Sequence, residues 1–359
     1  MQENDRIRFF LGANSPRGFY SLYDQLIDPK QAQAIYILKG GPGCGKSTLM
    51  RRIAAQAEEI GEQVEYIHCS ADPDSLDGIV LHGAKTAIVD GTAPHITEPC
   101  YPGAVENYVN LGDCYDSASL RTIRQDIMDC MVGYNDCYKR VYRCLNAATQ
   151  ITEDMRDSMT TQGLKEKAAK RAHGILKREA RPMCSGTGRV TRRFLDAITH
   201  QGTLTFYSTA HELCKRVYFL EDSCGFSHLI LSPLLAGLSQ SGYDVIACPS
   251  PMDPDRLEHL MVPELSLAFL RVPPGHSLQK CPYRKIRIDA MIDSELLRQN
   301  KNRLRFSQKI SAALIDEAVD SLAQAKAMHD NLEALYNPHV NFERVNHIAD
   351  QLSKAILID

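Results

Sequence analysis

The sequence predicts an α/β protein made of two tandem domains of one design, each with a parallel sheet and each followed by a long helical hairpin. Segments of the first half recur in the second half, short β-branched runs alternate with amphipathic stretches, and each half ends in a long region of helical periodicity. Strands that alternate with helices favour a parallel sheet covered on both faces. A chain of 359 residues also exceeds what one hydrophobic core usually holds.

The internal repeat is clearest where residues 61–80, GEQVEYIHCSADPDSLDGIV, are compared with residues 242–261, GYDVIACPSPMDPDRLEHLM. Both stretches carry D-P-D at the same place, at a spacing of 181 residues (242 minus 61). The opening FLGANSPRG at 10–18 likewise shares F-L-x-A-x-x-x-x-G with FLDAITHQG at 194–202. Agreement over so long a span indicates a duplication, and therefore two copies of one fold.

The elements of each copy follow one order. In the first copy, the apolar run 35–38 predicts a strand, residues 46–60 predict the amphipathic helix after it, and residues 86–89 predict a later strand. The runs at 217–220 and 267–270 predict the matching strands of the second copy. The helix at 46–60 would provide the crossover that two parallel strands need.

Long helical segments complete each copy. Apolar side chains recur at helical spacing through 117–180 and again through 293–357. We expect two helical hairpins, which pair with each other or with an unknown protein partner. The predicted boundaries are 1–116 for the first α/β domain, 117–181 for its helical hairpin, 182–190 for a linker rich in Gly, Ser and Pro, 191–289 for the second α/β domain and 290–359 for the C-terminal helices.

The composition argues against several classes of protein. A net charge of −3 provides no general attraction to nucleic acid or to a membrane surface. No apolar run approaches the roughly 20 residues that cross a bilayer, and the opening MQENDRIRFF is charged rather than signal-like. The 12 cysteines form no C-x-x-C pair, so they predict free, mostly buried thiols rather than zinc ligands. We expect a protein of the reducing cytoplasm.

The first copy contains a glycine-rich loop with the pattern of a phosphate-binding site. Residues 40–47, GGPGCGKS, fit G-x-x-x-x-G-K-[ST] between a β-branched run and a predicted helix, which is the context that a P-loop requires. Its glycines would let successive backbone N–H groups face one anion at the positive end of the helix. We therefore expect two tandem three-layer P-loop NTPase-like domains. The predicted ATP-binding residues are Gly40, Gly41, Pro42, Gly43, Cys44, Gly45, Lys46, Ser47 and Thr48.

Two side chains of this loop have predicted roles with ATP and Mg²⁺. We expect Lys46 to reach the β- and γ-phosphates and the Ser47 hydroxyl to bind Mg²⁺. Asp90 ends the run TAIVD and would be the second magnesium ligand. At the repeat spacing, these three positions become, in order, Ser227, His228 and Arg271. Because the three groups disappear together, the sequence predicts an active first copy and a degenerate second copy, whose loop lies within 217–231.

His68 is a weaker candidate. His68 ends the second predicted strand of the first copy, VEYIH at 64–68, and the end of such a strand is where an open parallel sheet binds its ligand. The second copy has no histidine at the matching position. His68 could sense the γ-phosphate or the attacking water, so the predicted catalytic residues are Lys46, Asp90 and His68. The acidic turn at 72–77 and His95 do persist in the second copy, which favours a structural role for them.

The pattern YILKGGPGCGKSTLM, followed by VEYIHCSADPDSLDGIV and AIVDGTAPH, resembles a family of duplicated P-loop ATPases, within the P-loop NTPase superfamily, from anaerobic endospore-forming bacteria. The resemblance covers nearly the whole chain, including the F-L-x-A opening of each half. Members of that family often carry a second G-K-[ST] loop, and this sequence departs from them there. The resemblance implies ATP binding and the P-loop fold, but no particular substrate.

Three functions fit these observations. The first is a Mg-dependent ATPase whose hydrolysis drives a conformational or regulatory change, with Arg216, Arg271 or Arg284 of the inactive copy as a candidate arginine finger. The second is a small-molecule kinase, because Gly91 stands where many ATPases carry a glutamate base. The third is a nucleotide-sensing scaffold with little hydrolysis. The basic run 165–181 makes nucleic acid a less favoured partner, and we expect no membrane association.

Overall fold

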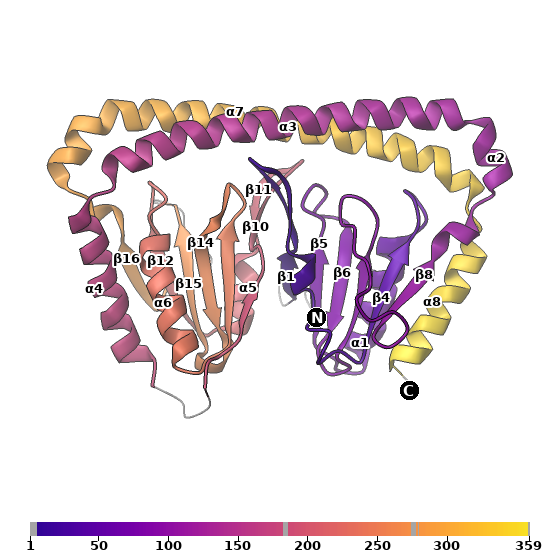
Figure 1. Ribbon diagram of the computed structural model, residues 1–359, viewed down its shortest axis with the longest axis horizontal. Helices are drawn as coiled ribbons and strands as arrows, with labels where there is room; N and C mark the ends of the chain where they lie inside the picture. Colours follow the sequence, from indigo (N-terminus) through magenta and orange to yellow (C-terminus); the bar gives the residue numbers. More distant parts are fainter. Residues whose placement is uncertain (1–5, 182–185, 274–277, 279, 358–359) are drawn as a thin grey trace.

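The computed structural model describes residues 6–181, 186–273, 278 and 280–357. They form two lobes that stand side by side below a pair of long helices (Figure 1). We call the lobe built on residues 6–116 the first lobe and the lobe built on residues 186–291 the second lobe. The predicted linker at 182–190 lies partly outside the described residues, which resume at 186.

Each lobe contains a six-stranded sheet, and the two sheets have the same strand order. The first sheet runs β1 (Ile7–Phe10), β5 (Val64–His68), β6 (Leu76–Leu81), β7 (Thr86–Asp90), β4 (Ala34–Lys39) and β8 (Glu106–Asn110). The second runs β9 (Val190–Arg192), β13 (Val245–Ser250), β14 (Asp253–Val262), β15 (Leu267–Val272), β12 (Arg216–Glu221) and β16 (Arg284–Arg287). The matching order is what a duplicated chain would produce.

The prediction of purely parallel sheets is wrong, because each sheet is mixed. β6 runs antiparallel to both of its neighbours, β5 and β7, and β14 does the same between β13 and β15. The connections at 69–75 and 251–252 are too short for a crossover helix, so in each lobe the chain returns beside the strand it has just left. β4 is parallel to β7 on one side and to β8 on the other.

One hydrophobic core joins the two lobes. Ile37 of the first sheet and Phe219 of the second belong to the same buried cluster. The Phe10 ring stacks on the Phe206 ring, with centroids 4.6 Å apart. Two short hairpins, which correspond to the repeated F-L-x-A openings, flank this junction: β2 (Gly12–Ser15) with β3 (Gly18–Ser21), and β10 (Asp196–Thr199) with β11 (Gly202–Thr205).

Helices cover the outer faces of the sheets. Side chains alternate along a strand, so Leu38 turns away from the shared core and packs with α1 (Lys46–Glu59). The matching helix of the second lobe is α6 (His228–Gln240). The expected three-layer domains are therefore half right, because the inner faces share one core that also includes α5 (Tyr207–Leu213) instead of each carrying a helical layer.

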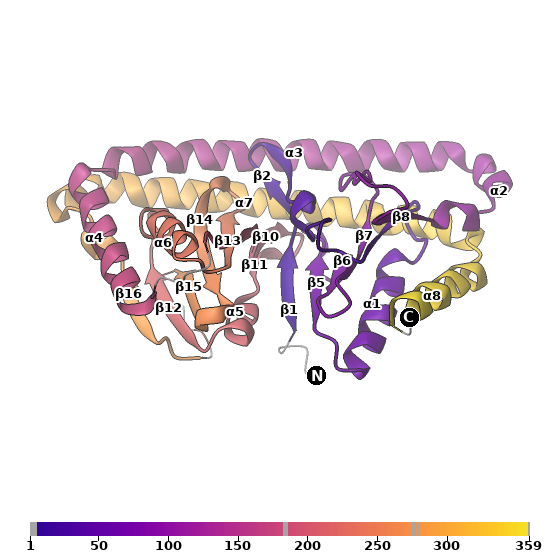
Figure 2. The ribbon, with the colours of Figure 1, turned by 60° about the horizontal axis from the view of Figure 1, so that its bottom comes forward.

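The long helices connect the lobes. α3 (Arg124–Met159) and α7 (Ser294–Tyr336) lie side by side above both lobes (Figures 1 and 2), which confirms that the helical segments pair with each other. α4 (Gln162–Glu179) then packs on α6, and α8 (Phe342–Leu357) packs on α1. The predicted hairpins are wrong, because each copy places its last helix on the outer helix of the other copy.

Short helical pieces complete the described chain: α2 (Ser117–Thr122) and the 3₁₀ turns Tyr23–Gln25, Leu111–Cys114, Pro263–Leu265, Asp289–Met291 and Asn337–His339. Of the helices that the structure describes, none is long and apolar enough to span a bilayer. The basic run at 165–181 forms α4, whose apolar side, including Leu164 and Ile175, is buried against the second lobe. Its lysines and arginines therefore lie on the solvent side of an ordinary amphipathic helix, whereas Glu179 is buried.

Candidate phosphate-binding site

The glycine-rich loop of the first lobe joins β4 to α1. Gly43 and Gly45 have φ angles of +70° and +82°, where a side chain would be strained. Within the described chain, the backbone amides of residues 43–47 have no hydrogen-bond acceptor, and no side chain caps the helix. A group of free donors thus stands at the positive end of a 14-residue helix, an arrangement suited to an anion.

Lys46 and Asp90, predicted to act together, lie together. Lys46 is the first residue of α1, and Asp90 is the last residue of β7, in register with Leu38 of the neighbouring strand. The Lys46 Nζ lies 3.5 Å from Asp90 Oδ2, and both side chains are nearly buried. The same Nζ donates to the carbonyls of Gly40 and Gly41, at 2.6 and 3.0 Å. A cation and an acid therefore meet at the mouth of the loop.

The other loop side chains have distinct environments. The Ser47 hydroxyl accepts a hydrogen bond from the backbone amide of Leu76 at 3.0 Å. The Cys44 side chain is buried in the core under α1, so only its backbone is available to a ligand. Thr48 is exposed. On the other side of the site, Asp90 Oδ1 accepts from the amide and the hydroxyl of Thr92, which fixes the carboxylate.

Residues far away in the sequence cover this loop, and sequence reasoning missed them. A Cβ on Gly43 would lie 2.5 Å from Asn337 Oδ1 at the end of α7, so only glycine fits. Phe342 and Val345 of α8 are within 4 Å of the Cβ position of Gly45. The Tyr115 hydroxyl donates to the Pro42 carbonyl at 3.1 Å. The Asn337-Pro338 helix break was the one available signal, and it did not indicate what the break contacts.

His68 is not brought into this group. It ends β5, and the strands β6 and β7 lie between β5 and β4. Its Nδ1 lies 2.6 Å from the Pro73 carbonyl, and its ring is 5.0 Å from the Phe206 ring of the second lobe. Burial lowers its pKa to about 4, so the imidazole is neutral at physiological pH. These contacts place His68 at the junction between the lobes, and its part in sensing the γ-phosphate stays a prediction.

The corresponding loop of the second lobe already contains an anion. Asp222, fully buried, follows β12 as Gly40 follows β4. Its carboxylate accepts from the amides of Cys224, Gly225 and Ser227 at 3.1, 2.8 and 2.7 Å, and from the Ser227 hydroxyl at 2.6 Å. The amides that hold a phosphate in a P-loop thus hold a side chain of the same loop. The loop of the second lobe therefore takes its negative partner from its own chain.

Arg271 balances the buried Asp222 charge. It lies at the Asp90 position, because Asp90 is in register with Leu38 and Arg271 with Leu220. Its Nε is 3.9 Å from Asp222 Oδ2, and its Nη1 donates to Glu258 at 2.7 Å. Burial alone would raise the pKa of Asp222, but the Arg271 charge and the Ser227 hydrogen bonds lower it.

The structure corrects two details of the sequence comparison. α6 begins at His228, so His228 rather than Ser227 takes the place of Lys46. The candidate arginine fingers are also occupied elsewhere: Arg216 pairs with Glu179, Arg271 pairs with Glu258, and Arg284 is on the edge strand β16. The described second lobe therefore brings none of these three to the first-lobe loop.

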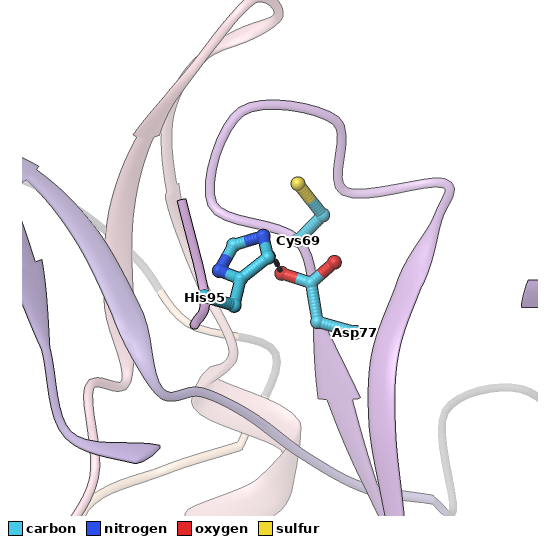
Figure 3. Close-up of side chains that lie close together, drawn as sticks. All are labelled: Cys69, Asp77 and His95. Carbon is cyan, nitrogen blue, oxygen red and sulfur yellow. Dashed lines mark ion pairs between the residues drawn. The ribbon is translucent and has the colours of Figure 1, made fainter. Parts of the chain in front are cut away.

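A second polar group in the first lobe consists of Cys69, Asp77 and His95 (Figure 3), whose ligand atoms lie within 4.8 Å of one another. His95 Nε2 is 3.2 Å from Asp77 Oδ2, which also accepts from the Tyr23 hydroxyl at 2.9 Å. Burial raises the pKa of the Cys69 thiol well above its ordinary value. The group is better explained as a buried hydrogen-bond network, in agreement with the structural role predicted for the acidic turn and His95.

Comparison with known proteins adds one partial similarity. A family model described as "Nephrocystin 3, N-terminal" matches residues 21–147, about a third of the chain. The matched region begins before β4 and includes the glycine-rich loop, Lys46 and Asp90. No curated protein matches the chain, and no solved structure does.

Proposed function

We propose that the first lobe is a P-loop NTPase-like domain that binds ATP with Mg²⁺ at residues 40–48 and hydrolyses it, while the second lobe is its catalytically inactive companion. One observation supports this chiefly: among the described residues the loop amides have no acceptor, and they lie where Lys46 and Asp90 meet. A loop that served only as a turn would gain stability from filling that space, as Asp222 does in the second lobe.

The residues present fit the proposed ligands. The amides of residues 43–47 would hold the phosphates, and Lys46 would exchange its carbonyl partners for phosphate oxygens. The Ser47 hydroxyl and Asp90 are the oxygen ligands available to Mg²⁺, which prefers oxygen. When bound, that ion would neutralise negative charge on the β- and γ-phosphates. The Cys44 side chain, being buried, would take no direct part.

The contacts of the loop suggest what nucleotide binding would drive. Asn337 and Phe342 lie against the loop glycines, and they stand at the junction of α7 and α8. A triphosphate that occupied the loop would compete with these side chains for space beside Gly43 and Gly45. We therefore expect ATP to move this junction, and α7 would carry the displacement toward the second lobe. An unknown protein partner that binds the long helices would sense the change. We also propose that the protein acts in the cytoplasm.

Two alternatives have a specific observation in their favour. Gly91 follows Asp90 and has no side chain that could act as a base. The Gly91 carbonyl accepts from Lys39 Nζ at 2.8 Å, so the group next to Gly91 is a cation. Slow hydrolysis would make the protein a nucleotide-sensing scaffold. Transfer to an acceptor would make it a small-molecule kinase, and turnover that requires an added metabolite would identify that case.

The decisive experiment compares ATP binding and turnover in wild type, Lys46→Ala and His228→Ala. Lys46→Ala should weaken Mg·ATP binding at least about 100-fold, roughly 2.7 kcal/mol, because the phosphates would lose the cation that lies at the mouth of the loop. His228→Ala changes the matching position of the second lobe and should bind ATP as wild type does. Wild-type protein that shows no calorimetric signal with Mg·ATP would overturn the proposal, as would equal binding by Lys46→Ala.

A further inference from the structure

The solvent side of α4 carries charges of one sign. Lys167, Lys170, Arg171, Lys177 and Arg178 are all exposed. With 3.6 residues per turn, these five positions fall within about one third of the helix circumference and extend along about 17 Å of its axis. No acidic residue of α4 falls within that third of the circumference. We call these five residues the basic stripe.

The acidic residues of α4 leave most of the stripe unpaired. Glu166, beside the stripe, accepts from Gln162 at 3.0 Å. Glu179 is buried against the second lobe, where the one member of the stripe that reaches it is Arg178, at 3.0 Å. Among the residues that the structure describes, the other four members of the stripe form no ion pair with an acidic side chain.

The matching helix of the other copy shows that the fold does not require such a stripe. α8 packs on α1 as α4 packs on α6, and both helices bury an apolar side. The charged residues of α8 are Glu343, Arg344, Asp350 and Lys354, two of each sign. The basic stripe is therefore additional to what the packing of this helix needs.

The basic surface continues onto the edge of the second sheet. β16 is an edge strand with the sequence RKIR, and its three cations are exposed, one of them paired with Glu221. Arg178 of the stripe donates to the Tyr218 hydroxyl at 2.8 Å, and Tyr218 is in register with Arg284 of β16. The end of the stripe and the edge strand are therefore neighbours, on the outer side of the second lobe (Figure 1).

An exposed aromatic ring lies where the stripe meets this edge. Tyr283 directly precedes β16 and is 43% exposed, and its ring centre lies 5.4 Å from that of Tyr218. The guanidinium groups of Arg216 and Arg284 lie 5.5 and 5.4 Å from the centre of the Tyr283 ring. Aromatic rings and arginines of this kind are the surfaces on which unpaired bases stack.

A lipid surface fits this part of the molecule poorly. A helix that lies on a bilayer inserts its apolar side among the lipid headgroups, but the apolar side of α4 is buried against α6. A row of cations that ends at an exposed ring instead meets the two requirements of a single nucleic-acid strand, which are a partner for its phosphates and a stacking surface for a base.

We infer that the basic stripe and Tyr283 bind single-stranded nucleic acid, with the phosphates along α4 and a base against the Tyr283 ring. Contacts to phosphates carry no sequence information, so the binding is independent of base sequence. It does not require ATP at the first-lobe loop, and the two sites can therefore be tested separately.

The test measures fluorescence anisotropy of a labelled single strand with the full-length protein, without ATP. The strand has about 20 nucleotides, which exceeds the roughly 4–16 that one binding domain usually covers, and is used as DNA and as RNA. The informative variant combines Lys170→Gln, Arg171→Gln and Lys177→Gln, because these three side chains are exposed and their loss leaves no carboxylate unpaired.

The matched control combines Lys30→Gln, Lys85→Gln and Lys354→Gln. These lysines are also exposed, and within the described chain they form no ion pair, but they belong to the first lobe and to α8. The two triple variants have the same net charge, so a difference between them depends on where the charges lie. Thermal melting establishes that every variant is folded.

We expect wild type and the control to bind the strand alike, and the α4 variant to bind it at least about tenfold more weakly at about 50 mM salt. The slope of log affinity against log salt should fall by about 2 in the α4 variant, since each phosphate contact of a single strand contributes about 0.7. Tyr283→Leu removes the ring without changing the charge and should weaken binding at least about fivefold.

Several results would overturn the inference. They are no binding of either strand by wild type at protein concentrations up to about 100 µM, equal binding by the α4 variant, and equal binding by Tyr283→Leu. Polyglutamate of the same length tests for an acidic protein as the partner, and equally tight binding to it would exclude recognition of nucleic acid. Binding to vesicles that contain phosphatidylserine, without binding to the strand, would identify a membrane surface instead.

Discussion

The two glycine-containing loops of this protein solve one electrostatic problem in opposite ways. Each loop leaves the strand next to an edge strand, β4 or β12, and enters an outer helix, so both create backbone amides that need a negative partner. In the first lobe Gly40 has no side chain, the amides stay free, and Lys46 pairs with Asp90. In the second lobe Asp222 fills the amides and Arg271 faces it.

The comparison shows how the loop of the second lobe is stable without a bound anion. An amide nest without an anion costs stability, because buried donors lose their hydrogen bonds to water. Replacing Gly40 by Asp222 supplies the anion from within, and replacing Asp90 by Arg271 restores the charge balance. The helix start differs accordingly: Gly45 has a φ of +82°, whereas Ser227 has a φ of −52° and uses its hydroxyl to bind Asp222. The loop of the second lobe therefore needs no bound anion.

The largest expected effect comes from giving the first loop the residue of the second. In Gly40→Asp, the new carboxylate would occupy the amides and repel phosphate, so Mg·ATP binding should weaken at least about 100-fold. Calorimetry measures this directly. Gly40→Ala is the control, because its Cβ meets the same Cys44 sulfur, at 2.8 Å, without adding charge. Equal loss of binding in both variants would show that the effect is steric and would remove the electrostatic explanation.

The next effect is on stability in the second lobe. Asp222→Asn should lower the free energy of unfolding by about 2–4 kcal/mol, because buried amides and Arg271 would lose their anion. Urea denaturation measures it. Asp136→Asn, on an exposed pair with Lys139, should change stability by less than about 0.5 kcal/mol. A loss equally small in Asp222→Asn would contradict the internal-anion interpretation.

The stability difference between wild type and Asp222→Asn should depend on pH. The folded protein lowers the pKa of Asp222, so its contribution is fully present above the unfolded value, about 3.9, and is lost as pH falls through the folded value. Wild type should therefore approach Asp222→Asn in stability as the solution is acidified below about pH 4. The difference between the two urea-unfolding free energies, measured from pH 7 downward, should shrink. A difference that grew on acidification would have the wrong sign.

The smallest expected effect concerns His68. His68→Phe should leave ATP turnover within about twofold of wild type, because the ring packs on Phe206 and a phenyl group preserves that contact. A coupled assay of ADP release measures it. Turnover should also show no titration of His68 near neutral pH, since burial holds its pKa at about 4. A loss of turnover without a loss of stability would restore the role first predicted for this residue.

The sequence by itself determined the features that local chemistry dictates. The G-K-S pattern with its preceding strand predicted the turn, the helix start at Lys46 and the free amides, since these depend on adjacent residues. The constant repeat spacing predicted two copies, and the paired loss of Lys46 and Asp90 predicted that the two side chains meet. Asp222 was visible in the sequence, but nothing in a one-dimensional comparison indicated that a side chain could replace the phosphate.

Only the tertiary structure decided which surfaces meet. The hydrophobic period of a helix shows that one face is buried but not what buries it. The sequence therefore left open whether the two helical segments pair with each other or with a partner, and it did not predict the exchange of α4 and α8 between lobes. A strand run similarly does not distinguish a parallel neighbour from an antiparallel one, which is how β6 and β14 were misjudged. The position of Asn337 beside Gly43 results from long-range packing of that kind.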